Sequence, residues 1–317
     1  MSHSIRLDNV SRAFGPVRAV HGMSFEIERG EMFALIGPDG AGKTTTLKMI
    51  LGLLPSDSGR IETLGLSPER DRLVLAEKVG YLPQRFSLYG DLSVDENISF
   101  FATIHGVGHW RSRRAELLKM MRLDPFRTRL ADRLSGGMKQ KLALCCTLIH
   151  TPELLILDEP TTGVDPVSRR EFWAILSGLK RDGITIVLTT PYLDEAERVD
   201  RVALMMKGRL LDLDTPARLR ASVRGSVIEV LARPKREAAD LLRRIPGVSG
   251  IETFGERLHA AVPDLSGEAA ETFGKTIEGS LRSAGVVVTT VRAVAPTLED
   301  LFISRVRNQE TGEEAVP

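Results

Sequence analysis

Short apolar runs, each bounded by polar or turn-forming residues, recur along the first two thirds of the chain. The runs at 32–36, 154–157 and 184–188 are typical of parallel strands that are buried on both faces of a sheet. Segments 5–10 and 23–29 alternate apolar and polar residues, which predicts half-buried antiparallel strands. Helical patterns lie between the buried runs, so the sequence predicts an α/β fold with a mixed sheet.

A glycine-rich segment lies between the run at 32–36 and a helical pattern at 46–51. It fits G-x-x-x-x-G-K-[ST] and consists of Gly37, Pro38, Asp39, Gly40, Ala41, Gly42, Lys43, Thr44 and Thr45. Its glycines let backbone N–H groups turn toward an anion, and the helix N-terminus adds partial positive charge. Lys43 is placed to reach the β- and γ-phosphates, and the Thr44 hydroxyl suits Mg²⁺. The alternative is a glycine-rich turn without a ligand, but strand, loop and helix together favour ATP or another nucleoside triphosphate.

Two acids follow the buried run at 154–157 directly. Asp158 and Glu159 stand at the carboxyl end of that strand, where doubly wound sheets hold their ligands. We expect Asp158 to bind in the Mg²⁺ shell and Glu159 to accept a proton from an attacking water. Thr161–Pro166 then predicts a tight turn before a helix at 168–179.

Two further segments have the chemistry of ligand contacts. Ser135 occupies an N-cap position before Gly136 and Gly137, whose backbone N–H groups open a second anion site at a helix start. Phe14 precedes a turn at Gly15, where an exposed ring could stack on a nucleobase. The alternatives are an ordinary capped helix and a core or hairpin aromatic.

From about residue 85 to 140 the pattern is helical and rich in arginine, which predicts a helical insert in the α/β domain. His105 and His109 lie four residues apart within it. Gly106 and Gly108 disfavour a continuous helix, and no third ligand is near, so a solvated loop is favoured over a metal site.

Composition limits the function classes. The 317 residues are 27% charged and 42% hydrophobic with a net charge of +1, so no overall basic field indicates nucleic acid as a partner. We expect neither a signal peptide nor a membrane span, so that any membrane role comes through a partner. The cysteines, Cys145 and Cys146, are adjacent in a helical stretch, which favours two small buried residues over a disulfide.

The motifs together resemble those of ATP-binding cassette (ABC) transporter subunits, over residues 5 to about 215. The resemblance rests on the loop 37–45, Gln84, the segment Leu134–Gln140, and Leu154–Glu159 with Asp165. It implies that Phe14 stacks on adenine, that Gln84 links the Mg²⁺ site to the helical insert, and that Glu159 is the general base. It also implies a dimer in which Ser135–Gly137 contact ATP held by a second cassette, with Asp165 at the interface.

One position departs from the family pattern. The family usually has a histidine directly before the segment 192–197, and here the residue is Pro191, which has no side-chain donor and no N–H. Two interpretations stay open: harmless drift in a loop, or a hydrolytically impaired site. The loss of this histidine, the loop 37–45 and the segment 83–89 also resemble first cassettes of tandem-cassette exporters. The resemblance therefore suggests pairing with a different, intact cassette.

Beyond about residue 220 the composition changes. Strands at 226–232, within 248–262 and at 286–294, with helices at 235–244 and 267–283, follow the ferredoxin-like order. A last helix is predicted after Thr297, its N-cap, and the polar tail 307–317 is predicted to be disordered. We therefore expect a cassette at 1–220 and a small α+β domain at 221–306, which resembles the accessory domain of ABC-2-type drug exporters.

These observations predict an ATPase subunit, peripheral at the cytoplasmic face of the cell membrane, that powers a separate ABC-2-type permease exporting a drug-like or lipophilic compound. One alternative is an ABC protein that works without a permease, although such proteins usually hold two cassettes in one chain. The other is a scaffold that binds nucleotide and hardly hydrolyses it.

Overall fold

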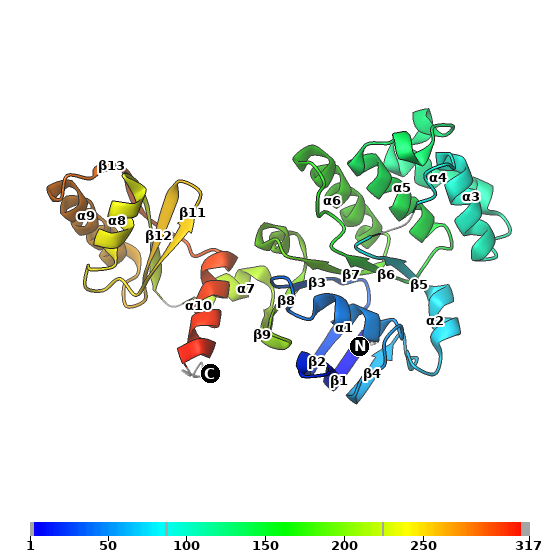
Figure 1. The fold of residues 1–317 in the computed structure, drawn as a ribbon, viewed down its shortest axis with the longest axis horizontal. Coiled ribbons are helices and arrows are strands. Elements are labelled where there is room, and N and C mark those ends of the chain that lie inside the picture. The colour runs from blue at the N-terminus through cyan, green and yellow to red at the C-terminus, as the bar shows by residue number, and fades with distance from the viewer. Residues whose placement is uncertain (1–2, 86–87, 224, 312–317) are drawn as a thin grey trace. The chain divides into compact units, whose positions relative to one another are not determined.

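The computed structural model describes residues 3–85, 88–223 and 225–311, and the chain divides into two compact units (Figure 1). The first unit is Met1–Leu213 and the second is Asp214–Pro317. The division lies before the predicted boundary at 220, because helix α7 (Pro216–Ala221) packs against α10 (Leu298–Thr311) of the second unit. No helix of the described residues is long and apolar enough to cross a membrane.

A six-stranded sheet carries Asp158 and Glu159 at the carboxyl end of one of its strands. Its strand order is β5-β6-β7-β3-β8-β9, and the neighbours from β5 to β8 pair in parallel. The hairpin β8–β9 turns at Lys207 and Gly208, both with positive φ, and so tight a connection joins antiparallel strands. The strands are β3 (Met32–Ile36), β5 (Val79–Leu82), β6 (Leu154–Asp158), β7 (Thr185–Thr190), β8 (Arg201–Met206) and β9 (Arg209–Asp214).

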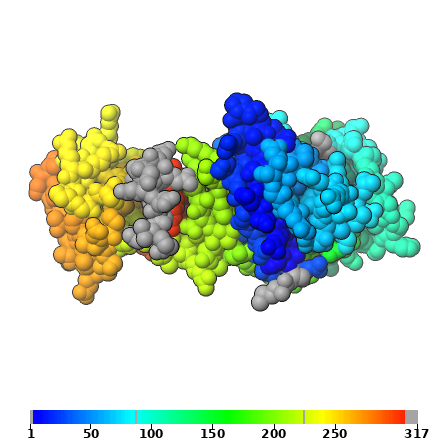
Figure 2. Space-filling model, turned by 90° about the horizontal axis from the view of Figure 1, so that it is seen from below, coloured from blue at the N-terminus to red at the C-terminus, as the bar shows by residue number. Residues whose placement is uncertain are grey.

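A second sheet is antiparallel, as the alternating segments predict, and its order is β2-β1-β4. Its strands are β1 (His3–Phe14), β2 (Val17–Glu28) and β4 (Ser58–Thr63). Both β1 and β2 extend further toward their connecting turn than the predicted segments 5–10 and 23–29. In the space-filling view the dark-blue N-terminal residues and the light-blue residues that follow lie side by side (Figure 2). Apolar side chains of this sheet, the larger sheet and α1 (Lys43–Ile50) form one buried core.

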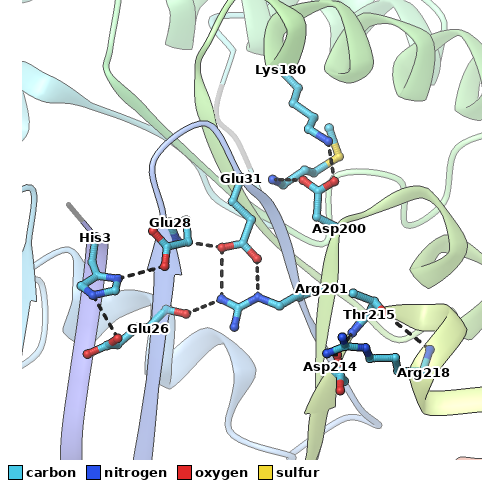
Figure 3. Close-up of polar contacts among 11 residues, drawn as sticks. His3, Glu26, Glu28, Glu31, Lys180, Asp200, Arg201, Asp214, Thr215 and Arg218 are labelled. Carbon is cyan, nitrogen blue, oxygen red and sulfur yellow. Dashed lines mark hydrogen bonds and ion pairs between the residues drawn. The ribbon is translucent and has the colours of Figure 1, made fainter. Parts of the chain in front are cut away.

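Polar contacts join the two sheets at the amino ends of the parallel strands. The Arg201 guanidinium bonds the Glu31 carboxylate at 2.7 Å and the Glu26 carbonyl at 2.6 Å (Figure 3). Asp200 accepts from the Met32 N–H at 2.9 Å and from Lys180. These pairs lie at the opposite end of the strands from Asp158 and Glu159, so they brace the unit without entering the candidate site.

The remaining helices of the first unit lie over the other face of the large sheet and beside it (Figure 1). They are α2 (Arg72–Lys78), α3 (Val94–Ile104), α4 (Trp110–Met121), α5 (Gly136–Leu148) and α6 (Pro166–Arg181), with 3₁₀ turns at Asp124–Phe126, Ala131–Arg133 and Leu193–Arg198. The segment predicted as a helical insert is thus helical, with a capping box at Ser93 and Glu96 starting α3. Cys145 and Cys146 are buried and unbridged.

The second unit has one sheet of order β11-β12-β10-β13. Its elements after α7 are β10 (Ser226–Arg233), α8 (Lys235–Leu242), β11 (Gly250–Phe254), β12 (Arg257–Val262), α9 (Gly267–Ser283), β13 (Val287–Val294) and α10. The strand and helix segments predicted from the sequence are therefore present. The tail prediction fails at its start, because α10 continues to Thr311, and residues 312–317 lie outside the described residues.

Candidate functional site

The loop between β3 and α1 requires its glycines. Gly40 and Gly42 have φ of 78° and 101°, in the region that favours glycine, and Gly42 is the N-cap of α1. A Cβ on Gly37 would lie 2.2 Å from the Met205 carbonyl oxygen, and one on Gly42 would lie 2.2 Å from that of Ala19. The loop is thereby held close to its neighbours, with the first N–H groups of α1 pointing out of the helix.

Lys43 lies inside this loop and is 4% exposed. Its ammonium donates to the carbonyl oxygens of Gly37 at 2.7 Å and Pro38 at 3.1 Å, and lies 3.4 Å from a carboxylate oxygen of Glu159. The positive charge is therefore aimed across the loop, where a phosphate anion gains most from it.

Thr44 and Asp158 meet at the same place from two elements. The Thr44 hydroxyl donates to Asp158 Oδ1 at 2.9 Å, and Asp158 ends β6 with only 1% of its surface exposed.

Burial, followed by the charge of Asp158, raises the pKa of Tyr81 to about 12, so this phenol of β5 stays neutral.

Glu159 turns sharply out of the sheet, with φ of 49°. Its carboxylate accepts from Gln84 Nε2 at 2.8 Å and from the Thr162 hydroxyl at 3.3 Å. The side chain is thus held between the loop that carries Lys43 and the segment after β5.

These residues fit a magnesium ion. A hydroxyl from Thr44, a carboxylate from Asp158 and the amide of Gln84 supply the oxygen ligands that Mg²⁺ prefers. Among the described residues, no group of three or more His, Cys, Asp or Glu side chains is placed to hold a metal ion.

Ser135 and Asp165 cap two neighbouring helices. The Ser135 hydroxyl accepts from the Met138 N–H at 3.4 Å at the start of α5, and Asp165 accepts from the N–H groups of Val167 and Ser168 at 3.0 Å. A hydrogen bond from Ser168 lowers the pKa of Asp165. Within the described residues, no hydrogen bond or ion pair joins Ser135, Gly136 or Gly137 to the loop 37–45.

Phe14 ends β1 at the turn with Gly15 and is 48% exposed. The guanidinium of Arg12 lies 5.0 Å from the centre of its ring. The ring is therefore an exposed aromatic and no part of the core, which removes the core alternative.

Pro191 follows the last residue of β7 and is partly buried. The hydroxyl of Thr190 accepts from the Tyr192 N–H at 3.0 Å, and the chain then enters the 3₁₀ turn 193–198. Glu195 anchors this turn, because its buried carboxylate accepts from Thr161 at 2.7 Å and from the indole of Trp173 at 3.2 Å. The proline at position 191 has no donor for a hydrogen bond to a phosphate.

His105 and His109 lie in an exposed turn between α3 and α4, as the predicted solvated loop requires. The ring of His105 stacks on that of His150 with 4.1 Å between the centroids, and His109 stands at the start of α4 instead. Burial, followed by the charge of His105, lowers the pKa of His150 to about 4. The sequence gives no sign of this pair, since His150 lies 45 residues further along the chain.

Sequence reasoning also misses Thr189, which lies opposite Asp158 in the register of β6 and β7. Its hydroxyl bonds the Asp158 carboxylate and the Glu159 backbone N–H. The sequence does contain a signal for this residue. Two threonines end the apolar run of β7 at the edge of the sheet that carries Asp158 and Glu159.

Comparison with known proteins adds independent evidence. A family model described as ABC transporter matches residues 20–162. The linearmycin resistance ATP-binding protein LnrL of Bacillus subtilis is 31% identical over 95% of this chain and 97% of its own length. This chain belongs to the ATP-binding proteins of ABC transporters. The daunorubicin resistance ATP-binding protein DrrA3 of Streptomyces coeruleorubidus is 34% identical to this ABC protein over 95% of each chain.

Some relatives of this ABC protein are much longer than the part of them that it matches. The probable multidrug ABC transporter ATP-binding protein YbhF of Escherichia coli is 40% identical over 68% of the chain, and the match spans 38% of YbhF. Among solved structures, cbiO1 from Clostridium perfringens, part of the transporter complex cbiONQ, matches 78% of the chain and 97% of its own with a TM-score of 0.64 and 27% identity. The cassette MJ0796, a dimer bound to ADP and phosphate, matches 67% and 98% with a TM-score of 0.60 and 26% identity.

Proposed function

We propose that this chain binds and hydrolyses ATP and thereby powers a separate ABC-2-type permease that exports a drug-like or lipophilic compound. The observation that carries the proposal is the convergence of Lys43, Asp158 and Glu159 on the loop 37–45. Relatives named for drug resistance and multidrug transport support the direction and the class of compound.

The residues divide the work of hydrolysis. Lys43 and the N–H groups at the start of α1 hold the β- and γ-phosphates, and Phe14 stacks on the adenine. Thr44, Gln84 and Asp158 hold Mg²⁺, which neutralises charge on the phosphate oxygens when it is bound. Glu159 takes the proton of the attacking water, so that water adds to the γ-phosphorus while the bond to the leaving ADP breaks.

A complete site requires a second cassette. Ser135, Gly136 and Gly137 open an anion-binding helix start, and among the described residues no hydrogen bond or ion pair joins them to the loop 37–45. We therefore assign them to ATP held by the facing cassette, with Asp165 at the dimer interface. Dimers of the cassette MJ0796 support this arrangement.

Pro191 supports a second, narrower candidate function. A side chain without a donor at this position removes one contact to the γ-phosphate, so the chain pairs with a different cassette whose site is intact. A dimer of that kind hydrolyses ATP mainly at the partner's site.

The transport role places the chain at the cytoplasmic face of the membrane, held there by its permease. Affinity purification from detergent-solubilised membranes of the native host, followed by mass spectrometry, tests this directly. We expect a membrane-spanning ABC-2-type protein to be recovered with the chain and to stimulate its ATP turnover. Recovery of the chain without any membrane protein would favour an ABC protein that works without a permease.

A further inference from the structure

Thr189 forms hydrogen bonds to both acids of the site. It lies in β7 with no exposed surface, and its hydroxyl donates to Asp158 Oδ1 at 2.6 Å. The same oxygen accepts from the Glu159 backbone N–H at 2.9 Å. A hydroxyl has one donor and two acceptor positions, so these two bonds fix its rotation.

We propose that Thr189 is a positioning residue for the reaction, which sets the Mg²⁺-binding oxygen of Asp158 and the backbone of Glu159 through one hydroxyl. The inference rests on the proposed function, because it assigns a role to a residue behind the two acids. In this role Thr189 acts through the two acids.

The first half of the role concerns Asp158. The hydroxyls of Thr44 and Thr189 both donate to Oδ1, at 2.9 and 2.6 Å. Two donors on one oxygen hold the carboxylate plane, in which Asp158 would serve as a ligand of the cation. Without the bond from Thr189 the carboxylate gains freedom to rotate, and ligand geometry for Mg²⁺ is demanding.

The second half concerns Glu159. Its φ of 49° is uncommon for a residue with a side chain, and such conformations persist where the surroundings hold them. The bond from its N–H to Thr189 Oγ1, with a longer one of 3.2 Å to the Thr189 carbonyl oxygen, supplies that hold. The backbone turn aims the carboxylate at Gln84 and Lys43.

Thr189→Val removes both hydroxyl bonds at nearly constant shape, whereas Thr189→Ser keeps the hydroxyl. Thr185→Val is the matched control, because Thr185 is a buried threonine at the other end of β7 whose hydroxyl pairs with Ser4 and with the Gly30 N–H at 3.0 Å each. All three full-length variants are compared with the wild type in two assays. One titrates magnesium chloride against a fluorescent ATP analogue, and the other measures kcat and KM for ATP.

We expect Thr189→Val to raise the Mg²⁺ concentration for half-maximal binding by about tenfold and to lower kcat by about 10- to 100-fold, with KM at saturating Mg²⁺ within about threefold of the wild type. Thr189→Ser stays within about threefold of the wild type in every readout. Thr185→Val does so too, although this variant loses thermal stability. If the wild type binds ATP but turns over slowly, the Mg²⁺ titration alone decides.

An unchanged Mg²⁺ requirement in Thr189→Val would overturn the inference while leaving the proposed function intact. Equal losses in Thr185→Val, or in Thr189→Ser, would overturn it too, because they would reduce the effect to stability or to packing. A wild-type chain that binds no ATP would refute the proposed function, and the inference with it.

Discussion

At the scale of single residues, Pro191 and Glu159 have opposite effects on the expected chemistry. Glu159 is held by Gln84 and lies 3.4 Å from Lys43, which fixes the carboxylate that we propose as the proton acceptor. Pro191 follows Thr190 without any donor for the γ-phosphate. In the proposed function, the site therefore has a base for hydrolysis but lacks one donor for the charge that develops on the γ-phosphate.

Restoring an imidazole at position 191 tests that combination. We expect Pro191→His to raise the kcat of the purified chain by about tenfold or more, because an added donor stabilises the developing charge. Pro191→Ala is the matched control, since it removes the ring without adding a donor, and it leaves kcat unchanged. Robust wild-type turnover that neither variant alters would show a competent homodimer and exclude the need for a different partner cassette.

At the scale of elements, the starts of α5 and α6 lie against each other. A Cβ on Gly137 would lie 2.2 Å from Ser168 Oγ and 2.4 Å from its Cβ, whereas one on Gly136 would meet nothing within 4 Å. Packing against Ser168 is by itself enough to require glycine at position 137. Gly136 has no such constraint, so we attribute any need for it to the proposed phosphate contact.

Alanine at each glycine separates these roles. We expect Gly137→Ala to destabilise the chain by about 1–3 kcal/mol through overlap with Ser168, and Gly136→Ala to stay within about 0.5 kcal/mol of the wild type. Urea unfolding monitored by circular dichroism measures both. Equal unfolding midpoints for the two variants would contradict the packing argument.

A second contact at this scale holds α10 to the sheet of its own unit. The His259 ring on β12 lies 3.0 Å from the Asp300 carboxylate on α10 and 3.7 Å from the Glu229 carboxylate on β10. The hydrogen bond to Asp300 raises the pKa of His259. Burial alone would raise the pKa of Asp300, but hydrogen bonds from His259 and Thr297 lower it overall.

The pH dependence of stability follows from these directions. The raised pKa of His259 gives stability that is complete below about pH 6.5, its unfolded value, and is lost as pH rises through the folded value. Asp300 contributes above about pH 4, and its share is lost as pH falls further. We expect His259→Gln to lower the melting temperature by about 2–4 °C near pH 6 and by less near pH 9.

The control for that measurement is His109→Gln, since His109 is exposed at the start of α4. Its melting temperature should follow that of the wild type at both pH values. An equal loss for His259→Gln at pH 6 and pH 9 would mean that the ring acts by packing and not by charge.

Sequence patterns predict most elements here, for a physical reason. Buried parallel strands such as β3, β6 and β7 are continuous apolar runs, and the loop 37–45 has a backbone that few sequences allow. Contacts that depend on register or on distant pairing are not local in sequence. The bond between Thr189 and Asp158, the stacking of His105 on His150, and the packing of α7 on α10 belong to that class.

At the scale of the whole molecule, the first unit carries every residue assigned to ATP, and the second is a separate compact unit. The relatives LnrL and DrrA3 match nearly the whole chain, so both units belong to the arrangement they share with this protein. The central claim concerns the first unit alone: ATP bound at the loop 37–45 is hydrolysed with Glu159 as the base.

Steady-state ATP hydrolysis by the purified chain tests that claim most directly. We predict turnover that Glu159→Gln lowers by about 100-fold or more, while the variant still binds ATP at least as tightly as the wild type. Turnover that Glu159→Gln leaves unchanged, or a wild-type chain that fails to bind ATP, would contradict the account.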